Sequence, residues 1–349
     1  MTPKLALFTA LAAAAAAPPA PPLSTIFTSH TLNHTCFRVP GAVTAPSGDL
    51  LVFVEARGAS CADNAPKDVA LARSSDGGAT WGAPQIVVAG YSAGTNHTCR
   101  NPTPVFAADG TLVLQFVNTT VEPWVTRQVT SADEGRTWGA PTAPLPAGAA
   151  ADSMLAGPGA GLRLANSGRL LFCGTNYYDP GARPPVGARV WTSDDGGRSW
   201  DAQPAAFFAG MAECAMAQLN NGSVLINFRA NHHDAACACR AQARSDDGGA
   251  TFTPFTSAPA LVEPVCSAGL LEAGGALYFS NPASRTARVN MTVRRSNDGG
   301  ATWPAAVTVW PAGAAYSVLV PLAQGHVGIV FERIAAGEYS DVVFAAPDF

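Results

Sequence analysis

The stretch Ser74-Ser-Asp-Gly-Gly-Ala-Thr-Trp81 is followed by four close variants of itself along the chain. Their aspartates are Asp76, Asp133, Asp195, Asp247 and Asp298, separated by 57, 62, 52 and 51 residues. Asp followed by Gly between β-rich flanks is typical of a tight turn, because the carboxylate caps the turn and Gly accepts a positive φ. We therefore predict that all five aspartates are structural and that the terminal aromatic residue packs between sheets.

A second repeat consists of an apolar strand, a Gly turn and another apolar strand. It spans 43–53, 105–116, 162–172, 216–228, 269–279 and 318–331, and an Asp motif follows each of the first five copies. Four strands every 50 to 60 residues is the rhythm of a propeller blade. The sequence thus predicts an all-β fold, a six-bladed β-propeller of four-stranded antiparallel blades.

The sixth copy has no Asp motif after it. We expect its blade to be completed by the last strand, 341–345, and by an early strand near 24–29, because pairing the chain ends removes an open sheet edge. A pair of β-sandwiches is the alternative, but it does not explain two repeats that stay in phase.

Composition excludes several classes of protein. Of the 349 residues, 13% are charged and 48% are hydrophobic, which indicates a large core and little disorder. The net charge of −4 and the absence of a basic run disfavour a nucleic-acid partner. The 34 Gly and 28 Pro residues make long helices improbable.

The N-terminus has the pattern of a secretory signal peptide. Lys4 precedes an apolar run over 5–17 and a Pro-rich patch that ends at Pro22, a run too short for a transmembrane helix. We predict a signal peptide and Pro-rich segment over 1–22, a propeller domain over 23–349, and a location outside the cell or in the secretory lumen. Five Asn-x-Ser/Thr sequons agree with this route, and the alternative is a disordered Ala/Pro-rich tail.

The eight cysteines are even in number, which permits four disulfides with 105 possible connectivities. Cys36 and Cys61 flank the first hairpin, so a bridge between them is expected, and Cys214 with Cys237 or Cys239 is a second candidate. No CxxC pair exists, so we predict neither a metal nor a cofactor.

Antiparallel order places residues just before the first strand and just after the second strand of each hairpin on one rim. The charged and phenolic residues at those positions are Arg38, Glu55, Arg57, Asp63, Glu213, Arg229, Arg288, Tyr316 and Glu332. Arginines in such numbers bind carboxylate or phosphate groups in bidentate fashion. The alternative is that some of them only form ion pairs between blades.

Several of these segments resemble those of sialidases. Phe37-Arg-Val-Pro40 is similar to the Phe-Arg-Ile-Pro motif of that family, and the five Asp motifs resemble its Asp-boxes. Further similar segments occur in family order at Glu55-Ala-Arg57, Ala212-Glu-Cys214, Asn227-Phe-Arg229, Arg288-Val-Asn-Met-Thr-Val293 and Ala315-Tyr-Ser317.

The resemblance implies a retaining exo-sialidase that removes terminal α-linked sialic acids, or related nonulosonic acids, from glycoproteins, glycolipids and oligosaccharides. It implies that Arg38, Arg229 and Arg288 grip the substrate carboxylate, with Tyr316 as nucleophile, Glu213 as its base and Asp63 as acid/base. Glu332 would hold Arg38, and Glu55 with Arg57 would line the pocket.

Two positions bear on the roles that the resemblance implies. Asp68 also follows Arg57 and competes with Asp63 for the acid role, which calls for a raised pKa. Val318 stands where sialidases commonly have Asp. A non-catalytic sialoglycan-binding propeller and a trans-sialidase are the alternative functions.

Overall fold

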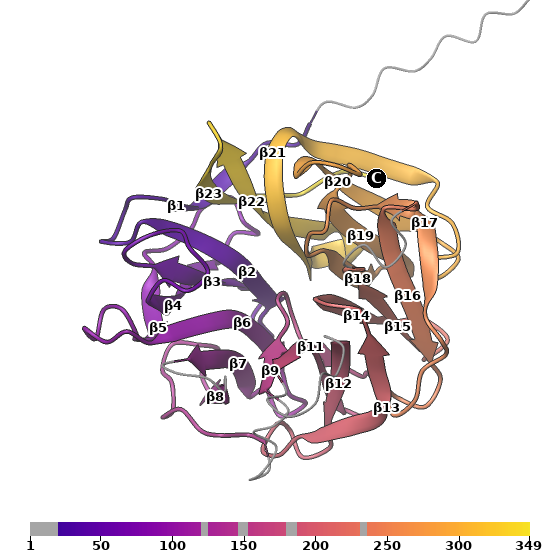
Figure 1. Ribbon diagram of the computed structural model, residues 1–349, viewed down its shortest axis with the longest axis horizontal. Coiled ribbons are helices and arrows are strands. Elements are labelled where there is room, and N and C mark those ends of the chain that lie inside the picture. Colours follow the sequence, from indigo (N-terminus) through magenta and orange to yellow (C-terminus); the bar gives the residue numbers. More distant parts are fainter. Residues whose placement is uncertain (1–19, 120–124, 146–152, 179–186, 231–235) are drawn as a thin grey trace, which may run out of the picture.

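The computed structural model describes residues 20–119, 125–145, 153–178, 187–230 and 236–349. Groups of β-strands lie around a common centre (Figure 1), and the predicted all-β fold is confirmed. Residues 1–19, which hold most of the predicted signal peptide, lie outside the described residues. No helix in the described part of the chain has the length and apolar character needed to cross a bilayer.

Each predicted hairpin forms the start of one group of antiparallel strands. The first group holds β2 (Cys36–Thr44), β3 (Leu50–Arg57), β4 (Lys67–Ser74) and β5 (Gln85–Val88), and the second holds β6 (Thr98–Phe106), β7 (Leu112–Thr119) and β8 (Val125–Ser131). The third group holds β9 (Ser153–Ala156), β10 (Leu162–Arg163), β11 (Leu170–Tyr178), β12 (Gly187–Ser193) and β13 (Asp201–Ala209), and the fourth holds β14 (Cys214–Gln218), β15 (Val224–Phe228), β16 (Cys239–Ser245) and β17 (Thr256–Val262). The fifth group holds β18 (Gly269–Ala273), β19 (Ala276–Pro282), β20 (Val289–Ser296) and the first half of β21 (Ala305–Pro321), and the sixth holds the second half of β21, β22 (Val327–Ala335), β23 (Glu338–Ala345) and β1 (Ser24–Thr28). A short 3₁₀ turn, η2 (Ala323–Gly325), links β21 to β22.

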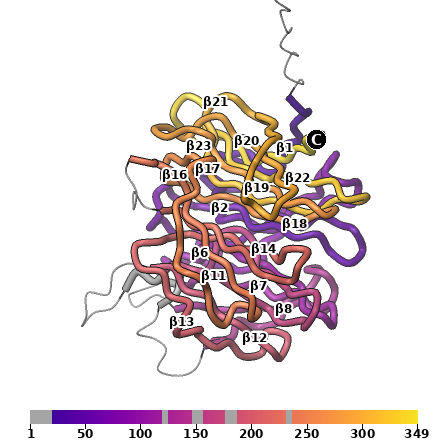
Figure 2. Tube along the Cα trace, turned by 90° about the vertical axis from the view of Figure 1, so that its right-hand side faces the viewer, coloured from indigo at the N-terminus to yellow at the C-terminus, as the bar shows by residue number. Residues whose placement is uncertain are grey.

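The two ends of the chain meet in one group, as the sequence predicts. Strand β1 pairs antiparallel with β23, with Ser24 opposite Phe344. Figure 2 shows the indigo and yellow ends of the described chain side by side. The pairing leaves no long unpaired edge on β23.

Strand β21 differs from the expected pattern of separate strands. It is one strand of 17 residues whose first part pairs with β20 and whose second part pairs with β22. Register shifts along both pairings mark the bend that lets it pass from one group to the next, because bulges bend a strand. The result is a seven-stranded sheet across two groups.

The apolar core lies between neighbouring groups. Leu51 and Phe53 of β3 pack in one cluster with Leu114 and Phe116 of β7. The first strands also contact one another in order, from β2 to β6, β10, β14, β18 and β21, and β21 contacts β2. The predicted rim residues, which lie within the first two strands of their groups or in the segments next to them, are therefore brought together near the centre.

The Asp motifs are turn structures, as predicted. Asp76 accepts the backbone N–H of Thr80 at 2.9 Å and the hydroxyl of Ser74 at 2.7 Å. Gly77 and Gly78 take φ values of +72° and +93°, which only Gly adopts without strain.

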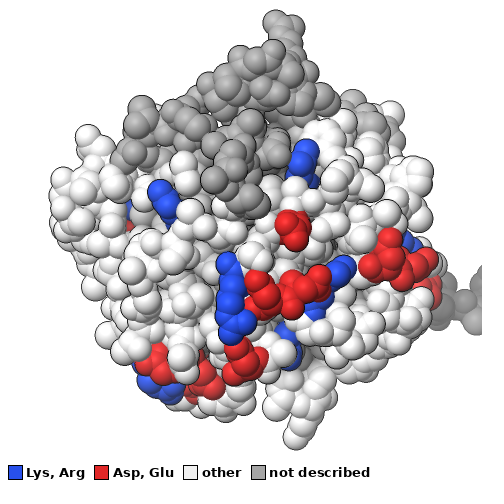
Figure 3. Space-filling model, turned by 90° about the horizontal axis from the view of Figure 1, so that it is seen from below, with Lys and Arg blue, Asp and Glu red and all other residues white. Residues whose placement is uncertain are grey.

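Viewed from below Figure 1, acidic and basic side chains largely adjoin one another and wide areas carry neither (Figure 3).

Three disulfides form in the described residues, and one prediction about them is wrong. Cys36–Cys61 is confirmed, but Cys214 pairs with Cys173 while Cys237 pairs with Cys239. Strand β15 lies between β14 and β16, so Cys214 and Cys239 are about two strand spacings, ~10 Å, apart. That distance exceeds the reach of a disulfide.

Candidate active site

All nine predicted site residues come together at one rim. Eight of them line a pocket of about 320 Å³, formed by Arg38, Val39, Glu55, Arg57, Asp63, Arg100, Asn101, Glu213, Arg229, Arg288 and Tyr316. Glu332 is fully buried beside Arg38. Most of the residues that line the pocket were thus predictable from the sequence, although they come from five of the strand groups.

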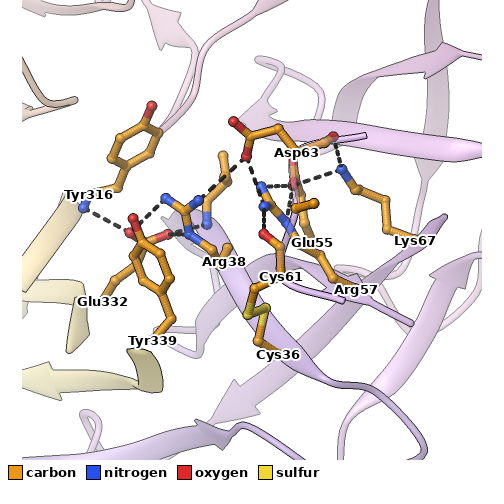
Figure 4. Close-up of polar contacts among 12 residues, drawn as sticks. Cys36, Arg38, Glu55, Arg57, Cys61, Asp63, Lys67, Tyr316, Glu332 and Tyr339 are labelled. Carbon is orange, nitrogen blue, oxygen red and sulfur yellow. Dashed lines mark hydrogen bonds and ion pairs between the residues drawn. A yellow bond between two sulfur atoms is a disulfide. The ribbon is translucent and has the colours of Figure 1, made fainter. Parts of the chain in front are cut away.

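Glu332 on β22 organises the side of the pocket that holds Arg38. Its two oxygens accept Arg38 Nε at 3.2 Å and Arg38 Nη2 at 3.3 Å. They also accept the backbone N–H of Val39 at 2.6 Å and of Tyr316 at 3.1 Å (Figure 4). Val39 has φ +56°, a strained value for a β-branched residue, and the bond to Glu332 helps to hold it.

Tyr316 on β21 lies between a carboxylate and a guanidinium. Its hydroxyl donates a short hydrogen bond to Glu213 Oε1, and Arg229 Nη1 donates to the Tyr316 oxygen at 3.0 Å and to Glu213 Oε2 at 2.6 Å. Burial, followed by the Glu213 carboxylate, raises the pKa of Tyr316 well above 10. The phenol is therefore protonated, and Glu213 accepts its hydrogen bond directly.

The three predicted carboxylate-binding arginines surround this phenol. The guanidinium carbons of Arg38 and Arg288 lie 5.6 and 5.5 Å from the centre of the Tyr316 ring, and Arg229 reaches its oxygen. Arg288 also donates to the Tyr339 hydroxyl at 3.1 Å, and the Arg38 guanidinium lies 3.7 Å from the centre of the Tyr339 ring. Tyr339 on β23 thus braces two of the three arginines.

Glu55 and Arg57 lie two residues apart on β3, so both point to the same face. Arg57 Nε and Nη2 donate to Glu55 Oε2 at 2.9 and 2.6 Å. Burial disfavours the ionised carboxyl, but Lys67 and Arg57 together lower the pKa of Glu55 to about 2. Glu55 is therefore an anion that holds Arg57 against the pocket.

The structure separates the two candidates for the acid. Asp63 carries a side chain that is 79% exposed, and its Oδ1 lies 2.8 Å from Arg57 and 3.5 Å from Arg38. Asp68 is buried, and its carboxylate is hydrogen-bonded to His34 Nε2 at 2.8 Å and to the backbone N–H of Gly90 at 2.7 Å. Asp63 alone of the two can meet a ligand in the pocket.

The expected raised pKa of Asp63 is wrong for this arrangement of side chains. Partial burial raises it, but the guanidinium groups of Arg57 and Arg38 outweigh burial and lower the pKa of Asp63. The reason is that the carboxylate lies directly on two cations, which the sequence could not show.

Four polar residues around the pocket were not predicted. Arg100 and Asn101 line it just before the second hairpin, a position equivalent to that of Arg38, so the same rim rule would have found them. Tyr339 follows the β22–β23 turn, which the rule did not consider. Lys67 begins β4, and nothing in its sequence context signals a buried cation.

The charge balance of the pocket favours an anion. Five guanidinium groups and three carboxylates are among the described residues that line it. Fixed arginine forks of this kind suit a carboxylate. Nowhere in the described ranges do three His, Cys, Asp or Glu side chains gather as a metal ion would require.

Comparisons with known proteins agree with this geometry. Residues 48–329 match the family described as BNR repeat-like domain. The chain is 31% identical over 327 residues to a sialidase of Micromonospora viridifaciens, covering 85% of this chain and 50% of that protein. It is 31% identical over 341 residues to a sialidase of Bacteroides fragilis, covering 87% and 61% respectively.

A solved structure shares the fold. The Hadza microbial sialidase Hz136 superimposes with a TM-score of 0.78 at 25% identity, over 91% of this chain and 66% of that one. The chain spans between half and two thirds of the length of these relatives.

Proposed function

Because the chain belongs to the family of sialidases with BNR repeat-like domains, we propose that it is a retaining exo-sialidase. Its substrates would be terminal α-linked sialic acids, or related nonulosonic acids, on glycoproteins, glycolipids or oligosaccharides. The observation that carries the proposal is the convergence of Arg38, Arg229 and Arg288 on Tyr316, whose hydroxyl bonds to Glu213.

The arginines account for recognition of the sugar. A sialic acid bears a carboxylate on its anomeric carbon, and three guanidinium groups around the phenol can grip that carboxylate next to the attacking oxygen. Hydrogen bonds to charged groups contribute roughly 1.5–3 kcal/mol each. Glu332 keeps Arg38 in place for this task, and Glu55 with Arg57 lines the pocket beyond it.

The phenol accounts for the covalent step. An Asp or Glu nucleophile would repel the substrate carboxylate, whereas neutral Tyr316 does not, and sialidases are known exceptions among glycosidases in using Tyr. Tyr316 Oη attacks the anomeric carbon while its proton passes to Glu213, and the bond from that carbon to the leaving oxygen breaks. Water then cleaves the sugar–Tyr bond as Glu213 returns the proton to the phenolate oxygen, so the configuration is retained.

Asp63 would supply the proton for the leaving oxygen and later take one from the attacking water. A substrate carboxylate on Arg38 would compete with Asp63 for that guanidinium and weaken the stabilisation of its ionised form. Substrate binding would thereby raise the pKa of Asp63 toward the value that a general acid needs.

We also propose that the strand groups close as a six-bladed propeller over residues 23–349. The cyclic order of contacts among the first strands and the β1–β23 pairing support closure. Residues 1–22 would act as a signal peptide for secretion, and N-terminal sequencing of protein from the culture medium would test this.

A fluorogenic α-sialoside tests the main proposal. We expect release of the fluorophore by the wild type, loss of release in Tyr316→Phe, and a reduction of about 10²–10⁴-fold in Glu213→Gln. Tyr278→Phe, which changes a buried phenol on β19 outside the pocket, is the matched control.

Two readouts address the alternatives. NMR should detect the α-anomer of the free sugar first, and an added lactose acceptor should yield sialyl-lactose only if the protein is a trans-sialidase. No release by the wild type, with glycan retained on a column of the immobilised protein, would instead indicate a binding propeller.

A further inference from the structure

The segment that carries Asp63 is anchored by a buried lysine. Residues 58–66 connect β3 to β4 without forming a strand, and the Asp63 side chain is mostly exposed. Lys67, at the first position of β4, is 0% exposed, and its Nζ donates to the backbone carbonyl of Asp63 at 2.6 Å (Figure 4). The same Nζ lies 3.5 Å from Glu55 Oε2. One cation thus ties the Asp63 backbone to the carboxylate that holds Arg57.

A lysine in this position is costly to the fold. The sequence contains two lysines, Lys4 and Lys67, and burial disfavours the charged form of such a group. Burial, opposed by the Glu55 carboxylate, lowers the pKa of Lys67 to about 8. An apolar side chain would avoid this cost, but it could not donate to the Asp63 carbonyl.

Two further contacts hold the same segment. Cys61 is linked by a disulfide to Cys36 at the start of β2, and its carbonyl accepts Arg57 Nη1. The segment is therefore fixed on both sides of Asp63, two residues before it and four residues after it. Together these contacts fix the backbone around Asp63, whose carboxylate meets Arg57 and Arg38 in the pocket.

We propose that Lys67 is a positioning residue for the acid/base Asp63, and that the Cys36–Cys61 disulfide is its partner in this task. The inference rests on the proposed function, because it assigns a purpose to the segment only if Asp63 transfers a proton. It predicts that loss of Lys67 affects proton donation to the leaving oxygen rather than attack by Tyr316.

Substrates with different leaving groups separate these steps. The aryl group of an aryl sialoside can leave as a phenolate with little protonation. The lactose of sialyl-lactose would be a poor alkoxide leaving group, so it depends on the acid to leave as an alcohol. A misplacement of about 1 Å can cost about 10²-fold in rate. We expect Lys67→Met to lower kcat/KM for sialyl-lactose by about 10²-fold and that for the aryl sialoside by less than about 10-fold.

Arg73→Met is the matched control. Arg73 lies on the same strand, pairs with Asp49 at 2.7 Å and donates to the Glu134 carbonyl, but it lies at the other end of β4 from Lys67, next to an Asp motif. Arg73→Met should change kcat/KM by the same factor for sialyl-lactose and for the aryl sialoside. Cys61→Ala provides a second variant in case Lys67→Met does not fold, and it should show the same dependence as Lys67→Met.

The outcomes are distinguishable. If the wild type is active, and the folded Lys67→Met and Cys61→Ala variants lose activity equally on both substrates or keep full activity on both, the inference is wrong. The proposed function would still stand in that case. A wild type that releases no sugar from either substrate overturns the proposed function and the inference with it.

Discussion

Replacement of Glu332 by Gln tests how the fold holds Arg38. Oε1 of Glu332 accepts the Val39 N–H and Arg38 Nε, while Oε2 accepts the Tyr316 N–H and Arg38 Nη2. Glutamine has the same shape but only one oxygen. In either orientation its amide nitrogen would face one backbone donor and one guanidinium donor, so two hydrogen bonds are lost and Arg38 loses its buried counter-charge.

The cost can be worked out in two ways. Two hydrogen bonds to a charged group at roughly 1.5–3 kcal/mol each amount to about 3–6 kcal/mol. Breaking a buried ion pair by removing one partner costs about 3–5 kcal/mol. Asp63 remains 3.5 Å from Arg38 but is largely exposed, so it offsets little of this loss. We expect the free energy of unfolding to fall by about 3–5 kcal/mol.

Thermal unfolding followed by scanning calorimetry measures this change. The entropy of unfolding, about 2.1 cal/mol/K per residue, gives about 0.7 kcal/mol/K for a chain of this length, so Tm should fall by about 4–7 °C. Glu338→Gln, an exposed change on the adjacent strand β23, is the matched control and should stay within about 0.5 kcal/mol of the wild type. A Glu332→Gln protein that unfolds within about 1 °C of that control would show that the bonds to Glu332 do not hold the site.

Further predictions concern pH, thiols and substrate affinity. The pKa of Glu55 is about 2 in the fold and ordinarily 4.5, so the stability that Glu55 contributes is fully present above pH 4.5 and is lost as the pH falls toward 2. When unfolding is measured at decreasing pH, the free energy of unfolding should therefore decline less in Glu55→Gln than in the wild type. Burial raises the pKa of Cys99 and of Cys266 to about 12, so the stability due to these thiols should be lost as the pH rises from 9 toward 12. At pH 8, iodoacetamide should modify both thiols only after unfolding, as peptide mass mapping will show; rapid native labelling would contradict the buried positions. Tyr339→Phe removes the hydroxyl that accepts from Arg288 but keeps the ring beside Arg38, so KM for a sialoside should rise by roughly 3–10-fold with little change in kcat, and an unchanged KM would argue against bracing.

The residues of the pocket show which site residues can be predicted from their positions just before or just after the repeated hairpins, and which cannot. Arg38, Arg229 and Tyr316 come just before or just after hairpins that the sequence repeats locate, so their convergence was predictable. Tyr339 and Lys67 were missed because their roles depend on groups elsewhere in the chain, the guanidinium groups of Arg38 and Arg288 for one and the Asp63 backbone carbonyl for the other. Similarly, the predicted Cys214–Cys239 bridge is excluded because β15 lies between β14 and β16, and the order of strands within a sheet was not considered in that prediction.

The repeats by themselves determined the all-β fold, the hairpins, the Asp-motif turns and the meeting of the chain ends, because turn chemistry and apolar alternation are local properties of the chain. Only the tertiary structure decided the protonation of the site. The lowered pKa of Asp63 depends on how close its carboxylate lies to Arg57 and Arg38, and the raised pKa of Tyr316 depends on its burial and on Glu213 from another strand group. The burial of Lys67 likewise depends on how the strands pack. Electrostatic interaction depends on distance and burial, and neither is written in the order of residues.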